Sequence, residues 1–145
     1  MTLQTIIDET IPSNLSLVSG FISAAVEKVL ALSLDDDDIF SFKLCLHEAV
    51  VNAMKHGNRL NSDLGVRVLV KVENSDLIAE VTDQGAGFDY RAIPDPTTEE
   101  NIGKYHGRGV YIIMNKMDKV KYCNEGRTIM MVKFLKKEGG DSGPK

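Results

Sequence analysis

The alternation of apolar and polar positions marks several strands along the chain. Residues 66–71 alternate valine with larger or charged side chains, and residues 77–82 form a second apolar run beyond a short polar turn. Two such runs so close together predict an antiparallel hairpin. Residues 119–123 and 128–135 predict a second hairpin in the same way, and residues 3–11 are typical of a short strand or an extended segment.

Apolar residues at helical spacing predict three helices between these strands. The first follows a helix start signal at residues 12–14 (Pro-Ser-Asn) and continues to about Ser33. The second covers about residues 39–56 and stops at Gly57, because glycine commonly follows the last turn of a helix. The third covers about residues 107–116.

The four aspartates at 35–38 stand where the second predicted helix begins. Acidic residues near a helix N-terminus interact favourably with the helix dipole and can cap it. A metal site is the alternative, but adjacent carboxylates lack the alternating spacing of a calcium-binding loop. We therefore expect a helix start within a solvated loop.

Composition and charge narrow the classes of function. Of the 145 residues, 43% are hydrophobic and 26% are charged, as is usual for a soluble globular domain. A net charge of -4 argues against a broad phosphate-binding surface, so we expect no direct nucleic-acid partner. No apolar run approaches the ~20 residues that a membrane span needs, and no secretory signal opens the chain, which predicts a cytoplasmic protein without a membrane partner. Cys45 and Cys123 lack the spacing of a metal or disulfide motif, so we expect two reduced, buried thiols.

Three polar residues of the second predicted helix, Glu48, Asn52 and His56, lie four apart on one line beside its apolar stripe. The Asn52 amide oxygen suits a hard cation such as Mg²⁺, and Glu48 suits a base for a group that attacks a phosphoryl group. On the helix alone, a solvent-facing edge explains the line more simply. For His56 we expect a structural role, as a hydrogen-bond partner of loop backbone at the helix end.

Asp83 follows an apolar strand and precedes Gly85 and Gly87. A carboxylate at a strand end can accept a hydrogen bond from the exocyclic amine of adenine, and glycines let the backbone approach a flat base closely. A plain Asp-x-Gly turn explains this segment about as well when it is taken alone.

Residues 103–110 form a glycine-rich approach to the third predicted helix. Glycines at a helix N-terminus leave N–H groups available to an anion, and Lys104 and Arg108 add positive charge for phosphate. The segment is neither a P-loop, since no Gly-Lys-Ser/Thr follows, nor a Rossmann fingerprint, since the third glycine is missing. The long polar connection over residues 84–106 is typical of a functional lid or a disordered segment.

Taken in order, these segments resemble the motifs of the GHKL (Bergerat-fold) ATP-binding superfamily. Residues 48–57 resemble its N box, residues 83–88 its G1 box and residues 107–110 its G2 box. The resemblance covers nearly the whole chain. It implies an α/β fold, namely a two-layer α+β sandwich whose mixed, largely antiparallel sheet carries helices on one face. It also implies a single ATP-binding domain over residues 1–137, followed by a flexible tail over residues 138–145.

Within this superfamily the chain is most similar to the stand-alone anti-sigma factor serine/threonine kinases of bacteria, whose Glu-Ala-x-x-Asn-Ala-x-x-His pattern is matched over residues 48–56. The similarity implies ATP and Mg²⁺ as cofactors and phosphorylation of a Ser or Thr on a small STAS-domain antagonist, the anti-anti-sigma factor. It further implies sequestration of a sigma factor in a partner-switching pathway, and a homodimer.

The resemblance also assigns roles to individual residues. Glu48 is the candidate general base, Asn52 the Mg²⁺ ligand and Asp83 the adenine partner, while residues 103–110 form the phosphate-binding lid. The expected ATP-binding residues are Asn52, Lys55, Asp83, Gly85, Gly87, Lys104, Gly107, Arg108, Gly109, Val110 and Thr128.

Two other functions stay open on the sequence. The same motifs would serve a nucleotide-responsive switch that grips a protein partner and transfers little or no phosphate. An α/β domain of another function would need three coincidental motif matches in the right order.

Overall fold

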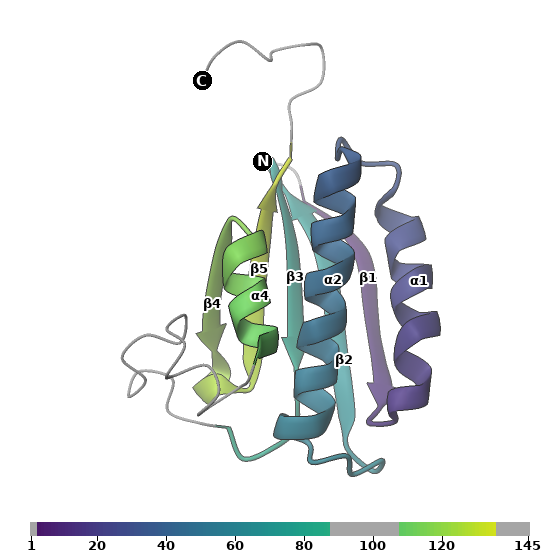
Figure 1. Ribbon diagram of the computed structural model, residues 1–145, viewed down its shortest axis with the longest axis vertical. Helices are drawn as coiled ribbons and strands as arrows, with labels where there is room; N and C mark the ends of the chain where they lie inside the picture. The colour runs from purple at the N-terminus through teal and green to yellow at the C-terminus, as the bar shows by residue number, and fades with distance from the viewer. Residues whose placement is uncertain (1–2, 88–107, 136–145) are drawn as a thin grey trace.

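The computed structural model describes residues 3–87 and 108–135 and has two layers (Figure 1). One layer is a five-stranded sheet, and the other consists of helices packed on one face of it. The expected two-layer α+β sandwich is therefore confirmed. The tail expected over residues 138–145 lies outside the described residues, so the division into one domain over 1–137 and a tail stays a prediction.

The sheet contains β1 (Leu3–Pro12), β2 (Gly65–Glu73), β3 (Asp76–Thr82), β4 (Lys119–Cys123) and β5 (Thr128–Phe134) in the spatial order β1-β2-β3-β5-β4. All four pairings within the described strands are antiparallel, and β2–β3 and β4–β5 are the two predicted hairpins. Because β3 and β5 are adjacent and antiparallel, the loop that follows β3 lies beside the turn that precedes β5. This juxtaposition positions one side of the site.

The helical layer contains α1 (Val18–Val29), α2 (Asp36–Asn52) and α4 (Arg108–Lys116). A 3₁₀ turn at Leu15–Leu17 precedes α1, and α2 continues directly into a π-helical segment at Ala53–Gly57. The long helix α2 lies between α1 and α4 and packs against both (Figure 1). Within the described ranges, none of the helices has the length and apolar character that a membrane crossing requires.

The first helix is shorter than its apolar pattern predicts, because it ends at Val29 rather than near Ser33. The Leu32 N–H donates to the Val29 carbonyl at 3.0 Å in a tight turn, and the Leu32 side chain packs against the core from that turn. Leu32 therefore continues the helical spacing in the sequence although it lies beyond the helix, which is why the prediction was too long.

The second helix begins at Asp36, earlier than the predicted start near residue 39. The Asp35 carboxylate caps it by accepting a hydrogen bond from the Asp38 N–H at 2.8 Å. The aspartate run is thus a helix start, as expected, and it contributes to the first turn of the helix as well as to the cap.

Alternate strand residues and the apolar stripe of α2 meet in one core. The valines Val66, Val68 and Val70 of β2 are fully buried, as their alternation with polar residues predicts. Burying one such side chain contributes on the order of 1.5–3 kcal/mol to folding. The predicted stripe of α2 is also buried throughout, at Phe42, Leu46, Ala49, Val50 and Ala53.

The two cysteines are free thiols. Cys45 is buried within α2, and burial raises the pKa of its thiol to about 11. Cys123 is only partly buried on β4. The expectation of two buried thiols therefore holds fully for Cys45 and in part for Cys123.

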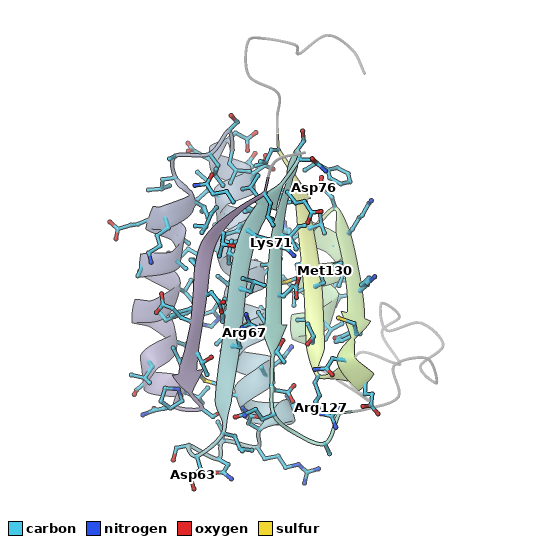
Figure 2. All side chains as sticks on the ribbon, turned by 180° about the vertical axis from the view of Figure 1, so that it is seen from behind. Asp63, Arg67, Lys71, Asp76, Arg127 and Met130 are labelled. Carbon is cyan, nitrogen blue, oxygen red and sulfur yellow. The ribbon has the colours of Figure 1, made fainter. Side chains whose placement is uncertain are left out.

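Charged and apolar side chains mix on the face of the sheet opposite to the helices (Figure 2). Arg67 forms a two-pronged ion pair with Asp8 at 2.9 Å, and Lys71 pairs with Glu80 at 3.5 Å. Ion pairs at the surface contribute little to stability, because water and salt screen them. They link neighbouring strands on the side away from the site.

Candidate functional site

A cavity of about 220 Å³ opens where β3 ends and β5 begins. Its walls come from the end of α2, the loop after β3, α4 and the β4–β5 hairpin. Its charged or polar side chains are those of Asn52, His56, Arg59, Asp83 and Arg127, and its larger apolar ones are those of Val81, Ile113, Tyr122 and Ile129.

The predicted polar line of α2 meets the first turn of α4 at one end of this cavity. A Cβ atom on Gly109 would lie 2.7 Å from Asn52 Nδ2 and 2.9 Å from Glu48 Oε1, closer than side chains tolerate. Glycine lets the backbone of α4 rest on both groups without displacing the ends of their side chains. Asn52 lines the cavity, and Glu48 stands one helical turn before it with its side chain 26% exposed. The structure thus brings together three residues that the sequence predicted as parts of one site.

The helix widens into a π-helical segment directly after Asn52. Such segments are rare and occur frequently at functional sites. This one contributes Ala53, His56 and Gly57 to the cavity wall. His56 is exposed, and its imidazole makes no hydrogen bond to another described residue, so the structural role expected for it is not seen in this part of the chain.

Asn58 is the residue that bonds loop backbone at this helix end, and sequence reasoning missed it. It is 2% exposed, and its Nδ2 donates to Ser13 Oγ and to the Gly65 carbonyl, both at 2.9 Å. Its Oδ1 accepts a hydrogen bond from the Gln84 N–H at 2.8 Å. A buried carboxamide with satisfied donors and acceptor fixes the loop after β3 to the start of β2.

Asp83, the first residue of that loop, is half-buried on the cavity wall. Burial raises the pKa of its carboxyl group, although a hydrogen bond from the Gly85 N–H at 2.8 Å and the charge of Arg127 act in the opposite direction. A Cβ atom on Gly85 would overlap the Gly57 carbonyl, so the loop packs directly on the end of the π-helical segment. This close packing aims the Asp83 carboxylate at the cavity.

Arg127 is a second site residue that sequence reasoning missed. Its Nε donates to the Gly85 carbonyl at 2.8 Å and its Nη2 to the Ala86 carbonyl at 3.2 Å. Its Nη1 lies 3.3 Å from the exposed carboxylate of Glu125. The guanidinium therefore joins the loop after β3 to the β4–β5 turn while it lines the cavity.

The inner wall suits a flat, partly apolar ligand. Val81 and Ile129 lie side by side on β3 and β5, and Ile113 reaches the cavity from α4. Tyr122 of β4 is largely buried, and burial raises the pKa of its hydroxyl. An apolar slot with one carboxylate at its edge is the type of surface that binds a purine.

The charge of the lining favours an anionic ligand. Arg59 and Arg127 are positively charged, and Asp83 is the acidic residue among the described lining residues. Arg59 has a left-handed backbone with φ 53° that turns the chain at this corner. The cavity lining is thus locally positive in a chain whose net charge is -4, which suits an anionic ligand.

The other expected binding residues lie at different distances from this cavity. Gly87 lines it, Val110 is buried in α4, and Lys55 is exposed on the π-helical segment. Thr128 is buried, and its hydroxyl group shares a hydrogen bond of 2.8 Å with that of Thr82. Since residues alternate along a strand, Thr128 faces away from the cavity that Ile129 lines.

Part of the expected phosphate-binding lid lies outside the described residues. Arg108 is the first residue of α4, whereas Lys104 and Gly107 lie outside the described residues. Binding roles for Lys55, Thr128 and the lid residues stay predictions.

The side-chain oxygen of Asn52, beside the Glu48 carboxylate, fits a magnesium ion that is coordinated mainly by the phosphate oxygens of a nucleotide. Among the described residues, no three His, Cys, Asp or Glu side chains gather as a metal site. Asn52 offers an amide oxygen on the cavity wall, next to the carboxylate of Glu48. Mg²⁺ commonly takes one or two protein oxygens and completes its octahedron with phosphate oxygens and water.

Comparisons with known proteins agree with this geometry. Residues 11–133 match the model of the histidine kinase-like ATPase domain. The chain is 34% identical to the serine-protein kinase RsbW of Staphylococcus epidermidis over 115 residues, which cover 70% of this chain and 69% of the relative. It is 33% identical to the serine-protein kinase RsbW of Staphylococcus aureus with the same coverage. The chain therefore belongs to the histidine kinase-like ATPase family, within the GHKL superfamily that its three motifs resemble.

Proposed function

We propose that this chain is an ATP-dependent protein kinase that transfers the γ-phosphate of ATP to a Ser or Thr of a small STAS-domain antagonist. The observation that carries the proposal is the meeting of Glu48 and Asn52 with Gly109 beside a cavity that Asn52 and Asp83 both line. Family membership and the similarity to relatives named as serine-protein kinases support the same class of reaction.

The purine occupies the apolar end of the cavity in this proposal. The Asp83 carboxylate accepts a hydrogen bond from the exocyclic amine of adenine, while guanine would present a carbonyl oxygen to the same carboxylate. Sites built to pair with one polar group discriminate strongly against an analogue that lacks it. The half-buried position of Asp83 strengthens this preference, because water screens the contact only in part.

The triphosphate extends toward Glu48 and the first turn of α4. There the Glu48 carboxylate removes the proton of the substrate hydroxyl group as that oxygen attacks the γ-phosphorus. The bond between the γ-phosphorus and the bridging oxygen breaks, ADP leaves with the electron pair, and the phosphate ester forms on the substrate. Glu48 then releases the proton to solvent through its exposed edge.

Asn52 holds the metal ion through its side-chain oxygen. Bound Mg²⁺ supplies charge neutralisation on the phosphate oxygens. Because Asn52 and Glu48 lie on consecutive turns of one helix, the distance between the metal ligand and the base is fixed before the substrate binds.

The partners of the proposed kinase follow from its similarity to anti-sigma factor kinases. They are a STAS-domain anti-anti-sigma factor as substrate and a sigma factor that the kinase form sequesters in a partner-switching pathway. We also propose that residues 1–137 act as one domain and as a homodimer.

A Glu48→Gln variant tests the proposed reaction. The unaltered protein, incubated with Mg²⁺, γ-labelled ATP and the STAS-domain protein encoded beside its gene, should transfer label to that protein. Glu48→Gln should bind ATP within about 3-fold of the unaltered affinity but lose at least about 100-fold in transfer rate, because general-base catalysis contributes about 10²–10⁴-fold. Glu27→Gln, on the exposed part of α1, is the matched control and should behave like the unaltered protein.

Three results separate the alternatives. Full transfer by Glu48→Gln removes Glu48 as the base. Nucleotide-dependent capture of the STAS-domain protein without any label supports the nucleotide-responsive switch instead. An isothermal titration that detects no ATP binding in Mg²⁺ buffer contradicts both functions.

A further inference from the structure

The loop after β3, described over residues 83–87, is held from two sides. On the inner side, Asn58 Oδ1 accepts the Gln84 N–H, and Gln84 Oε1 in turn accepts the Gly65 N–H. On the outer side, the carbonyl groups of Gly85 and Ala86 accept hydrogen bonds from Arg127 and from no other described residue. The outer half of the loop therefore depends on a side chain that comes from the β4–β5 turn.

The loop and this turn also meet through their backbones. The Asp83 N–H donates to the Arg127 carbonyl at 3.0 Å. Gly87, which has a left-handed backbone with φ 78°, lies so close to the Glu125 carbonyl that a Cβ atom there would overlap it. The two segments thus form one wall of the cavity, with the guanidinium between them as a two-pronged tie.

We propose that Arg127 is a positioning residue of the nucleotide site, which fixes the loop so that Asp83 faces the purine before the nucleotide arrives. The inference rests on the proposed function. Ordering a loop at the moment of binding costs free energy, and a preformed loop avoids that cost. A planar guanidinium suits this task because its N–H groups reach two carbonyl oxygens at once, which a lysine ammonium on a flexible stem does less well.

The tie should act on affinity and leave the chemical step unchanged. Arg127 bonds neither Glu48 nor Asn52 within the described residues, and these two side chains come from α2, whereas Arg127 comes from the β4–β5 turn. Loss of the tie therefore releases the purine wall while the base and the metal ligand keep their geometry. The signature of a positioning role is a raised KM for ATP with an unchanged kcat.

Arg127→Ala and Arg127→Lys in the full chain test this inference. Arg127→Ala should raise the Kd and the KM for ATP at least about 10-fold, with kcat at saturating ATP within about 2-fold. Arg127→Lys keeps the positive charge but loses the planar group that reaches both carbonyl oxygens. It should therefore bind ATP at least about 5-fold more weakly than the unaltered protein. The matched control is Glu125→Ala, which removes a partner of Arg127 whose side chain is 84% exposed, and its affinity should stay unchanged.

Amide hydrogen exchange keeps the test decisive if Arg127→Ala folds poorly. The Gly85 and Gly87 amides should exchange faster in Arg127→Lys than in the unaltered protein, while the core strands exchange at the same rate. Unaltered affinity in Arg127→Ala, full rescue by Arg127→Lys, or a lower kcat at constant KM overturns the inference alone. Absence of ATP binding by the unaltered protein overturns the proposed function, and the inference with it.

Discussion

Gly109 of α4 lies directly against Asn52 of α2, so closely that a methyl group on Gly109 would come within 2.7 Å of the Asn52 Nδ2 atom. The contact joins the start of one helix to the last turn of another, which are far apart in the sequence. It places the first turn of α4 against the two side chains to which we assign the metal ion and the base. Any displacement at this contact moves the side chains that we assign to the metal and the base.

Gly109→Ala should therefore impair phosphate transfer far more than folding. The new methyl group meets only the ends of the Asn52 and Glu48 side chains, which can shift, and alanine favours the helix by about 1 kcal/mol. We expect the free energy of unfolding to change by less than about 1 kcal/mol. The transfer rate should fall about 10- to 100-fold, because small misplacements of catalytic groups cost factors of this order.

Gly20→Ala is the matched control for this substitution. Gly20 lies in α1, and a Cβ atom there would meet nothing within 4 Å. This variant should gain about 0.5–1 kcal/mol in the free energy of unfolding and keep the unaltered transfer rate. Urea unfolding and the label-transfer assay measure both quantities. Equal activity of the Gly109 and Gly20 variants would show that the contact with Asn52 is unimportant for the reaction.

Asp83→Asn should weaken ATP binding and reduce the preference for ATP over GTP. The new Oδ1 atom can still accept the Gly85 N–H, but an NH₂ group then replaces the oxygen that faces the adenine amine. Loss of one hydrogen bond to a charged group corresponds to about a 10- to 100-fold loss of affinity. Isothermal titration with both nucleotides measures the change. An unchanged preference for ATP over GTP would show that the adenine binds away from Asp83.

The pH dependence of Asp83 provides a further prediction. Burial raises the pKa of this carboxyl group above its usual value in the folded protein, so the folded state binds the proton more tightly than the unfolded state. Stability without nucleotide should therefore decrease as pH rises through the raised pKa. ATP affinity should change in the opposite direction, because only the ionised carboxylate accepts from adenine. Asp83→Asn should remove both dependences, as chemical unfolding and titrations across the acidic range can show.

The far end of α4 is anchored by Lys133 of β5. Its ammonium lies 3.4 Å from the Asp38 carboxylate in the first turn of α2 and donates to the Lys116 carbonyl at 3.0 Å, with side-chain exposures of only 12% for Lys133 and 18% for Asp38. Lys133→Met should lower the free energy of unfolding by about 1–3 kcal/mol, because it leaves a poorly hydrated carboxylate and carbonyl without their partner.

Lys71→Met is the control for the anchor. Lys71 pairs with Glu80 at 3.5 Å on the more exposed face of the sheet. This pair should contribute less than about 1 kcal/mol. Equal losses in the two lysine variants, measured by urea unfolding, would contradict the anchoring role of Lys133.

Residues that act through local patterns could be predicted from the sequence. The alternating valines of β2 and the four-residue spacing of Glu48 and Asn52 each follow from the geometry of one element. The predicted end of the first helix was wrong, because Leu32 continues the apolar spacing of the helix although it lies beyond the last helical residue. The π-helical segment at Ala53–Gly57 could not be predicted, since one wide turn leaves no distinct period in the sequence.

Residues that act across the fold were missed for a different reason. Arg127 and the Gly85 carbonyl that it binds are 42 residues apart, and Asn58 is 26 residues from Gln84. Neither pair has a spacing that an element would impose. The one available signal was position, because Asn58 directly follows the N-box segment and Arg127 directly precedes a strand that borders the site.

The most direct test of the proposed site is a crystal structure with Mg²⁺ and a non-hydrolysable ATP analogue. We predict that the adenine amine lies within hydrogen-bond distance of the Asp83 carboxylate, and that the metal ion contacts the side-chain oxygen of Asn52. The γ-phosphate should lie on the side of the cavity that holds Glu48. A nucleotide bound outside this cavity would contradict the proposed site. So would a nucleotide in the reverse orientation, with its phosphates at Asp83 and its adenine at Glu48.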